Sequence, residues 1–316
     1  MLITVLGRIA QFLLMLSMLK ISTYLLSPDE IGKMALLMST IAFISLFLIN
    51  PIGMYVNRHF HGWNNNGRVR QYLNYHWIYI FIISILSTTS LGLLSYLGLI
   101  STHLSIQFVT FFMFSTLFFN TINQTTIPSL NMLGYRESFT LLSIGTVFFG
   151  IVFAVVFTTC FGKIAEFWLL GLLAGQVLFA FVGSKFFFNR INPPDTNLEF
   201  KLSLKNIKSI FNFSWPIALA VGLTWFQSQS YRFFIEYSFG VHELGLFVAG
   251  YGISAGIIAA FEAVFATYFQ PLFYKGLSNG QSESEIKAWN EYAAAIIPSL
   301  LLLFFVITTL APILTG

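Results

Sequence analysis

The chain has 316 residues and a formal net charge of +4, and 56% of its residues are hydrophobic while only 9% are charged. An ordinary soluble domain has about 25% charged residues, so this composition excludes a soluble enzyme or binding domain. Apolar runs of about 20 residues, long enough to cross a hydrocarbon core of about 30 Å, recur along the whole chain. We therefore expect an all-α polytopic membrane protein.

Apolar runs separated by polar breaks predict nine membrane-spanning helices. The first run carries Arg8 and Lys20 and lacks a small-residue cleavage site, so it is interpreted as a retained helix and not as a signal peptide. The single cysteine, Cys160, lies inside an apolar run and excludes an intramolecular disulfide. The spans are predicted at residues 4–26, 33–56, 74–98, 105–132, 139–161, 167–188, 211–238, 244–272 and 291–313.

A short polar break, Ser27-Pro28-Asp29-Glu30, precedes the second span. An N-cap serine, a first-turn proline and a glutamate three residues after the cap are typical of a helix start, so a capping box is predicted between Ser27 and Glu30. Later in the same span, Asn50-Pro51 and Gly53 predict a kink, which either serves a moving lobe as a hinge or is purely structural.

The lysines and arginines orient the chain in the membrane. Connections after odd-numbered spans hold two of the 16, Lys33 and Lys163, and three more lie inside spans. Connections after even-numbered spans hold the other 11: Arg58, Arg68, Arg70, Arg136, Lys185, Arg190, Lys201, Lys205, Lys208, Lys275 and Lys287. Because cytoplasmic connections carry the excess of positive charge, the N-terminus and the even-numbered connections are predicted to be cytoplasmic.

The longest polar stretch connects the sixth and seventh predicted spans. We expect an N-terminal six-helix lobe over residues 1–190, a cytoplasmic connection over 191–210, and a partial second lobe of three helices over 211–316. Within the connection, apolar residues share one helical face and lysines are interspersed, so this segment is either an amphipathic helix on the inner membrane surface or a solvated linker. Since the chain stops directly after an apolar run, we expect further helices beyond residue 316.

A repeat relates the two lobes. At an offset of 213 residues, the break before the second span aligns with "YSFGVHELG", residues 237–245, and pairs Glu30 with Glu243 and Gly32 with Gly245. Both breaks follow odd-numbered spans, so both are predicted to face outward, and the repeat is parallel rather than inverted. Transporters commonly contain such repeats, with the substrate site at the interface between them. The repeat therefore favours a transporter.

The same residues carry a family resemblance. The turn "LLSPDEIG" after the first span, Gly53 late in the second span and Arg58 at its cytoplasmic exit resemble the opening of polysaccharide-biosynthesis membrane proteins of the O-antigen flippase type. These proteins belong to the multidrug/oligosaccharidyl-lipid/polysaccharide exporter superfamily, whose members generally have twelve or more helices. The resemblance implies a protein of the bacterial inner membrane that flips a polyprenyl-diphosphate-linked oligosaccharide between leaflets, by alternating access of two lobes, for O-antigen or lipopolysaccharide synthesis.

The resemblance also implies partners: the lipid-linked oligosaccharide, the lipid bilayer, and a polysaccharide polymerase with its chain-length machinery. It implies no cofactor. The basic connections follow from membrane topology and therefore indicate no nucleic-acid partner. The sequence contains no phosphate-binding glycine loop, nucleophile elbow or pair of catalytic carboxylates, so we expect no enzyme activity and no metal.

Cations inside predicted spans are the first candidates for binding a diphosphate, because ionisable groups are expensive in a membrane. Lys20 and Arg232 fall within one residue of each other in the repeat, so each lobe places a cation in the outer part of its first helix. Two such cations would suit a diphosphate, which offers several acceptor oxygens. Snorkelling toward the headgroups is the alternative for both. Arg8, one turn from the cytoplasmic end, is a third candidate with the same alternative.

Two carboxylates inside predicted spans are candidates for ion coupling. Glu236 follows Arg232 by four residues on the same helical face, so it either pairs with that arginine or takes up a coupling ion. Glu262 lies well inside the eighth span with no partner on its own helix. An isolated carboxylate there is either protonated or paired to a cation on another helix.

The fourth span carries amide side chains at Asn120, Asn123, Gln124 and Asn131, at spacings that predict a shared polar face. Such amides either hydrogen-bond the hydroxyls of a sugar or join helices within the bilayer.

Three functions are therefore compared. A flippase for a lipid-linked oligosaccharide fits the repeat and the cations. An ion-coupled multidrug exporter of the same superfamily would require carboxylates where the spans offer cations. A membrane-embedded polymerase or acyltransferase would require a large external loop or a polar cluster at the membrane surface, and the predicted external connections are short.

Overall fold

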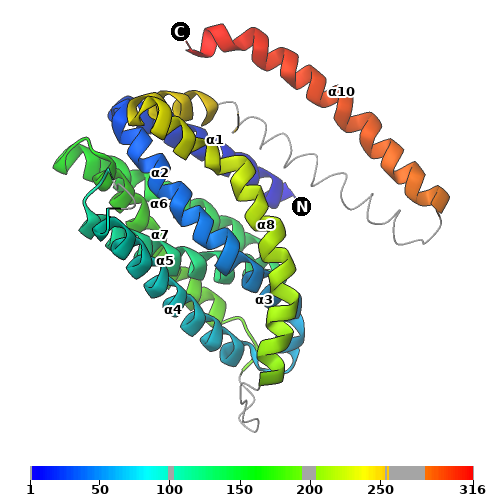
Figure 1. The fold of residues 1–316 in the computed structure, drawn as a ribbon. Helices are drawn as coiled ribbons and strands as arrows, with labels where there is room; N and C mark the ends of the chain where they lie inside the picture. Colours follow the sequence, from blue (N-terminus) through cyan, green and yellow to red (C-terminus); the bar gives the residue numbers. More distant parts are fainter. Residues whose placement is uncertain (1, 99–102, 194–203, 253–254, 256–281, 316) are drawn as a thin grey trace. The chain divides into compact units, whose positions relative to one another are not determined.

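The computed structural model describes residues 2–98, 103–193, 204–252, 255 and 282–315, and every regular element in these ranges is a helix (Figure 1). The described residues divide into two compact units, Met1–Val248 and Ala249–Gly316. The first unit contains α1 (Leu2–Leu25), α2 (Pro28–Ile44), the π-helical turn η1 (Ser45–Ile49), α3 (Asn50–Asn65), α4 (Val69–Tyr96), α5 (Ile106–Met132), α6 (Arg136–Phe161), α7 (Ala165–Phe188) and α8 (Leu204–Phe239). The second unit contains α10 (Ser282–Thr315).

Six helices of the described part are long and apolar enough to cross a membrane. They are Pro28–Asn65, Val69–Tyr96, Ile106–Met132, Arg136–Phe161, Ala165–Phe188 and Ile207–Phe239, while the apolar stretch Ile9–Leu25 of α1 is shorter. The prediction of an all-α, multi-pass membrane protein is confirmed. A helix over residues 241–252 opens the predicted eighth span, most of which lies outside the described residues.

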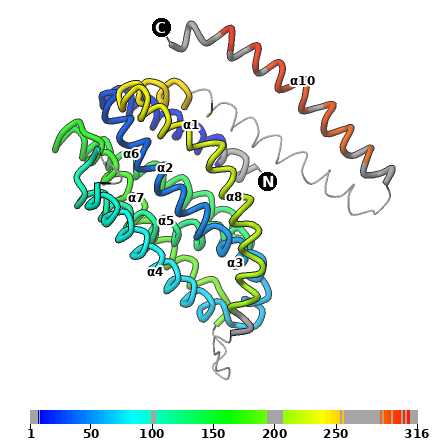
Figure 2. The backbone as a smooth tube through the Cα atoms, viewed as in Figure 1, coloured from blue at the N-terminus to red at the C-terminus, as the bar shows by residue number. Residues whose placement is uncertain are grey.

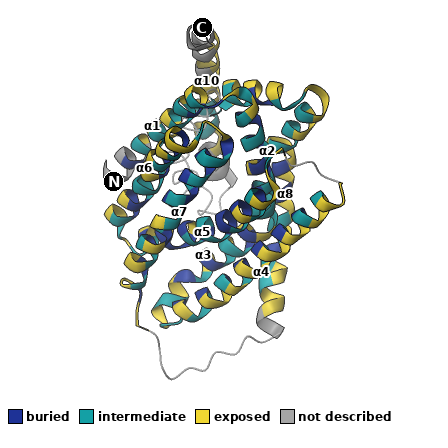
Figure 3. Cartoon of the chain, turned by 90° about the vertical axis from the view of Figure 1, so that its left-hand side faces the viewer, coloured by how far each residue is buried: buried dark blue, intermediate teal, exposed yellow. Residues whose placement is uncertain are grey.

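The helices of the first unit bury one face and expose another that is also apolar (Figure 3). Within the bundle, Leu117 and Leu169 are almost completely buried, whereas Phe111 and Phe181, on the same two helices, are more than half exposed. Apolar side chains on the outside of a bundle are favourable only against lipid. The distribution of burial therefore agrees with a bundle that lies in a bilayer.

Small residues set the closest helix pair in the unit, α6 with α7. A Cβ atom on Gly171 would overlap the backbone of Ala154, and one on Gly175 would overlap the backbone of Gly150. Gly171 and Gly175 form a G-x-x-x-G spacing, which lets two helix backbones approach within a membrane. The glycines therefore hold α6 and α7 in close backbone contact.

The second predicted span is one continuous helix with a π-helical turn, η1, in its middle. Pro51 lies two residues after the end of η1 and cannot donate a backbone hydrogen bond, so the backbone preceding it must rearrange. The Tyr79 hydroxyl on α4 donates to the Leu48 carbonyl at 2.8 Å and so satisfies an acceptor inside this turn. The irregularity predicted at Asn50-Pro51 is therefore a π-helical turn.

The capping box predicted between Ser27 and Glu30 is wrong. Ser27 is the N-cap residue of α2 and Pro28 lies in its first turn, but the Ser27 side chain makes no capping hydrogen bond. The Glu30 carboxylate instead contacts the Lys33 ammonium at 2.7 Å and accepts from the Ala165 amide at 2.7 Å. Ala165 is the first residue of α7, where free N–H groups and the helix dipole attract a carboxylate more strongly.

α8 packs along the whole of Pro28–Asn65 in the opposite direction (Figure 2). The two surfaces in contact, one on α8 and one on α2, η1 and α3, are called the α8 interface below. The bundle end with the connections after α1, α4, α6 and α8 is called the Asp29 end, and the opposite end is called the Arg58 end. α8 is a single helix from Leu204, so residues 204–210 of the predicted connection continue directly into the span.

Candidate functional site

The centre of the α8 interface contains the guanidinium of Arg232. Its Nη1 atom donates to the hydroxyl oxygen of Ser39 on α2 at 3.0 Å and lies 3.5 Å from the Ala35 carbonyl oxygen. Its Nε atom lies 3.4 Å from the Tyr231 hydroxyl, and the guanidinium carbon lies 5.8 Å from the centre of the Tyr231 ring. All of these partners are uncharged.

Ser39 is the centre of a small polar network between the two helices. It is fully buried, and its hydroxyl has two acceptors in reach, the Ala35 carbonyl at 2.8 Å and Oε1 of Gln229 at 3.2 Å. The Trp225 indole donates to the Ser39 carbonyl at 2.9 Å. Three α8 side chains, one turn or less apart, therefore converge on one α2 residue, because residues three and four apart share a helix face.

The position of Ser39 decides between a cleft and a snorkelling arginine. Ser39 is 11 residues inside the start of α2 at Pro28, which is about 16 Å along the helix axis. A snorkelling guanidinium would point toward the Asp29 end and its headgroups. Arg232 instead contacts α2 at membrane depth, so its charge is held inside the interface.

The charge of Arg232 has no anionic partner within the described residues. Its side chain is only half-buried, and the printed contacts use Nε and Nη1, whereas a guanidinium has five N–H donors. Donors on the remaining nitrogen, Nη2, are therefore free of any described partner. An uncompensated cation at this depth is costly, and an anionic ligand would remove that cost.

Aromatic rings continue the interface from the polar network toward η1. Phe43 lies 5.0 Å from Trp225 and Phe47 lies 6.5 Å from Phe226, measured between ring centres. A Cβ atom on Gly222 would overlap the Phe47 ring, so the glycine makes the space that this ring occupies. The α8 interface thus has a polar centre next to an apolar, aromatic segment.

Glu236 does not pair with Arg232, although it lies one turn away. Its carboxylate Oε1 contacts Nε2 of His103 at 2.8 Å, and His103 lies in the connection between α4 and α5. Of the two alternatives for Glu236, the pair with Arg232 on the same helix is not present in the structure, because the histidine of another segment takes the carboxylate. Within the described residues, Arg232 therefore has no carboxylate partner, and the pair with His103 joins the end of α8 to the α4–α5 connection.

The other predicted ionisable candidates do not join Arg232 in the described structure. Lys20 is exposed on α1, and no hydrogen bond or ion pair joins its ammonium to a described residue. Arg8 lies in α1, and its side chain is outside the described part. Glu262 also lies outside the described residues.

The predicted amide face of the fourth span is divided among different environments on α5. Asn123 is buried, and its amide nitrogen donates to the Gln176 carbonyl on α7 at 2.7 Å. Asn120 is half-buried, whereas Gln124 and Asn131 are exposed. Asn123 therefore joins two helices, and Asn120, Gln124 and Asn131 are the amides that a ligand could reach more readily.

Sequence reasoning missed Ser39, Gln229 and Trp225. None is charged, so none stands out in an apolar span, but Trp225, Gln229 and Arg232 follow a spacing of four and three that places them on one face. A metal site is also not indicated, because the described residues contain no group of three histidine, cysteine or acidic side chains that could hold an ion.

One protein family matches this sequence. No curated protein and no solved structure matched the sequence significantly. The profile of one family, described as polysaccharide biosynthesis protein, matches residues 23–316, which is nearly the whole chain. It includes the break before α2, the α8 interface and Arg232. The chain belongs to the polysaccharide biosynthesis protein family.

Proposed function

We propose that the protein flips a polyprenyl-diphosphate-linked oligosaccharide across the bacterial inner membrane for synthesis of a cell-surface polysaccharide. The observation that carries this proposal is Arg232, an arginine without a described anionic partner at membrane depth. The family places the chain in polysaccharide biosynthesis. A diphosphate is the anionic part of the lipid-linked intermediates that such a pathway must move between leaflets.

The geometry of the site suits a diphosphate. A guanidinium presents donors in a planar fork, and hydrogen bonds from it to phosphate oxygens are short and strong. Ser39 and Gln229 add polar groups beside the guanidinium. The aromatic segment with Phe43, Phe47 and Trp225 offers an apolar wall next to the polar centre, which suits a ligand whose anionic group is bonded to a hydrocarbon chain.

The orientation follows from the distribution of charge. At the Arg58 end, arginines cover aromatic rings: Arg58 lies 5.3 Å from the Phe213 ring centre and Arg190 lies 4.5 Å from that of Tyr135. Positively charged connections face the cytoplasm. In this proposal the Arg58 end and the N-terminus are cytoplasmic, and the Asp29 end is external.

The remaining candidates have secondary roles in the proposal. Lys20, exposed on α1, and Arg8 would guide the diphosphate into and out of the interface. Asn120 and Gln124 would bind sugar hydroxyls, and Glu262 would couple an ion to the cycle. No bond is made or broken, so the protein is no enzyme. A polysaccharide polymerase with its chain-length machinery would use the flipped product.

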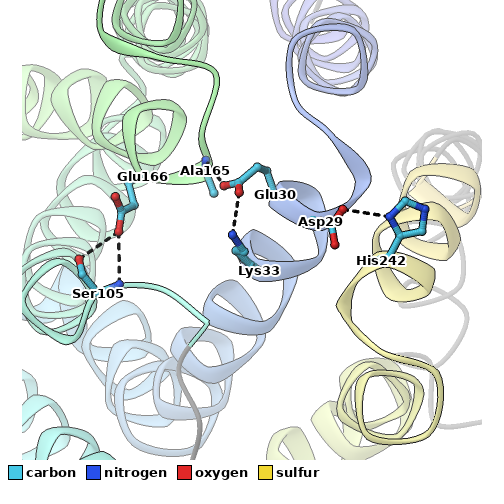
Figure 4. Close-up of polar contacts among 7 residues, drawn as sticks. All are labelled: Asp29, Glu30, Lys33, Ser105, Ala165, Glu166 and His242. Atoms are coloured by element: carbon cyan, nitrogen blue, oxygen red, sulfur yellow. Dashed lines mark hydrogen bonds and ion pairs between the residues drawn. The ribbon is translucent and has the colours of Figure 1, made fainter.

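An ion-coupled drug exporter is the second candidate function. A site for cationic drugs requires a carboxylate at membrane depth, whereas the described centre of the α8 interface carries an arginine. A polymerase or acyltransferase requires a polar reaction centre at the membrane surface. The described residues at the Asp29 end form helix caps and ion pairs instead (Figure 4).

The test is deletion of the complete gene in its native host, followed by measurement of the lipid-linked oligosaccharide in each leaflet. We expect the intermediate to accumulate in the inner leaflet and wild type to reverse this. Arg232→Ala, and more completely Lys20→Ala/Arg232→Ala, should fail to reverse it. Arg190→Ala, which removes a cation at the Arg58 end, is the matched control and should complement. Deletion without accumulation, in a host that lacks a second flippase, would contradict the proposal.

A further inference from the structure

Two turns that the repeat makes equivalent touch each other at the Asp29 end. Nδ1 of His242 lies 3.0 Å from Oδ2 of Asp29, and these two residues are 213 positions apart, which is the offset of the repeat (Figure 4). His242 comes directly after the turn at Gly240, whose positive φ of 93° is accessible to glycine at little cost. Equivalent residues of the two halves therefore meet.

The glycines of the repeat make a reciprocal contact around this pair. A Cβ atom on Gly32 would overlap the carbonyl oxygen of Val241, and one on Gly245 would overlap the carbonyl oxygen of Pro28. The offset of 213 converts Gly32 into Gly245 and Pro28 into Val241, so the two contacts are one contact seen from each half. Such an isologous arrangement requires a two-fold axis. The axis passes between Asp29 and His242.

The first turn is firmly attached to the first lobe. The Glu30 carboxylate binds Lys33 and the N-terminal amide of α7, as described above. Beside it, Glu166 on α7 accepts from the amide and the hydroxyl of Ser105, at 3.3 Å and 3.0 Å, at the start of α5. Figure 4 shows these contacts next to the Asp29–His242 pair. The turn before α2 therefore moves with the first lobe.

In the second turn, Leu244 is fully buried. Polar contacts near the surface also hold this turn to the first lobe. They are the Asp29–His242 pair, whose side chains are each 52% exposed, and the His103–Glu236 pair, at 32% and 23%. Val248, six residues beyond His242, packs against the buried cluster that includes Leu26 and Ile31. Exposed ion pairs are weak and yield to solvent, so the two pairs themselves cost little to open.

We propose that the turns at 27–32 and 240–245 are the two halves of an external gate, closed by the interlocked Gly32 and Gly245 and latched by the Asp29–His242 and His103–Glu236 pairs. The gate closes the Asp29 end while the ligand enters the α8 interface from the Arg58 end, and it opens to release the ligand to the outside. The identity of this ligand, a lipid-linked oligosaccharide, rests on the proposed function.

The gate is tested with a cysteine pair. Asp29→Cys and His242→Cys are introduced together into Cys160→Ser protein, because Cys160 is the single native cysteine. The pair is oxidised in reconstituted full-length protein, and disulfide formation is measured by mass spectrometry alongside flipping of the lipid-linked oligosaccharide. We expect the disulfide to form, flipping to fall in proportion to the oxidised fraction, and a reductant to restore it.

The matched control is a cysteine pair at Asn64 and Asn192. These asparagines are hydrogen-bonded at the Arg58 end, at 3.1 Å and 2.8 Å, and both belong to the first unit, Met1–Val248. Their disulfide should leave flipping unchanged, because it joins residues of one rigid body.

The outcomes separate the gate from the proposed function. If the Asp29–His242 disulfide forms and flipping continues, or if it does not form, the gate is wrong while flipping stands. If the reduced pair cannot flip, the two residues belong to the transport path itself and the gate assignment is wrong. If wild type does not flip in this assay, the proposed function fails, and the disulfide yield still reports whether the turns meet.

Discussion

The Asp29 end and the Arg58 end of the bundle are held by different chemistry. At the Asp29 end, two histidine–carboxylate pairs, Asp29 with His242 and Glu236 with His103, join segments beside the α8 interface. At the Arg58 end, Phe213 of α8 lies 5.5 Å from the Tyr55 ring centre and is covered by Arg58, and the Ser214 hydroxyl contacts the Pro51 carbonyl at 3.4 Å.

This difference in chemistry would allow the two ends to open one after the other. Ion pairs at a surface respond to protonation and to salt. Aromatic contacts respond to neither and depend on buried area. Arg232 lies between the two kinds of contact, so a ligand bound to it can be reached from one end while the other stays closed.

Two reporter cysteines compare the ends in Cys160→Ser protein: Ala35→Cys, buried near the Asp29 end, and Ser214→Cys, buried near the Arg58 end.

The largest effect is expected from Arg232→Ala, which removes the centre between the two ends. Loss of a charged hydrogen bond costs about 1.5–3 kcal/mol, so affinity for a polyprenyl-diphosphate lipid should fall about 10- to 150-fold. The measurement is binding of that lipid to purified protein, with Arg190→Ala as the control. Equal affinity of Arg232→Ala and wild type would remove the arginine from the site.

Gly245→Val should break the Asp29 end alone. The added side chain would overlap the Pro28 backbone, and overpacking costs about 1–3 kcal/mol. Labelling of Ala35→Cys by an impermeant maleimide from the Asp29 side should therefore accelerate about 5- to 150-fold, with labelling of Ser214→Cys unchanged. Gly250→Val is the control, because a Cβ atom there meets no atom within 4 Å. Equal acceleration by both valines would show that close approach is not what closes this end.

The Asp29 end should also open at alkaline pH. The hydrogen bond with Asp29 raises the pKa of His242 above its ordinary value of about 6.5. The contact is therefore fully present below that ordinary value and is lost as the pH rises through the raised pKa. Glu243 favours protonated His242, Lys33 favours ionised Asp29, and both act in the same direction.

The reporter for this pH effect is Ala35→Cys, compared with wild-type Cys160, which is exposed and corrects for thiol ionisation. The labelling rate of Ala35→Cys divided by that of Cys160 should rise severalfold as the pH passes above the pKa of His242. In protein that also carries His242→Gln, this ratio should not change with pH. A flat ratio without that substitution would contradict the latch.

The smallest effect is expected from Arg58→Ala at the opposite end. An exposed cation on an aromatic ring contributes about 0.5–1 kcal/mol, so labelling of Ser214→Cys from the Arg58 side should accelerate about two- to fivefold. The Arg58–Phe213 contact itself should not depend on pH between 6 and 8, because neither of its two side chains titrates there. A pH-dependent response would show that the two ends do not differ in the way described.

Sequence alone predicted the helices well and the contacts between them poorly. The spans follow from hydropathy, which acts residue by residue, and Arg232 stands out because charges are rare in apolar runs. The capping box failed because the amide of Ala165, 135 residues away, competes for Glu30. Glu236 likewise takes His103, and no local spacing reveals a partner on another segment.

The repeat offset aligns Asp29 with His242, and the structure shows these residues in contact, although alignment in a repeat does not require contact. Only two-fold packing of the halves places equivalent residues face to face. The G-x-x-x-G spacing on α7 is likewise present in the sequence. Only the packing of the helices shows that its partner is Gly150-x-x-x-Ala154 on α6.

The proposed flipping activity is tested most directly by reconstitution of the full-length protein into sealed vesicles. A polyprenyl-diphosphate-linked oligosaccharide is placed in both leaflets, and a membrane-impermeant glycosidase removes sugar only from the outer one. With wild type, cleavage should proceed past the outer-leaflet half to near completion, and with Lys20→Ala/Arg232→Ala it should stop near that half. Cleavage that stops at the outer-leaflet half with wild type would contradict the account.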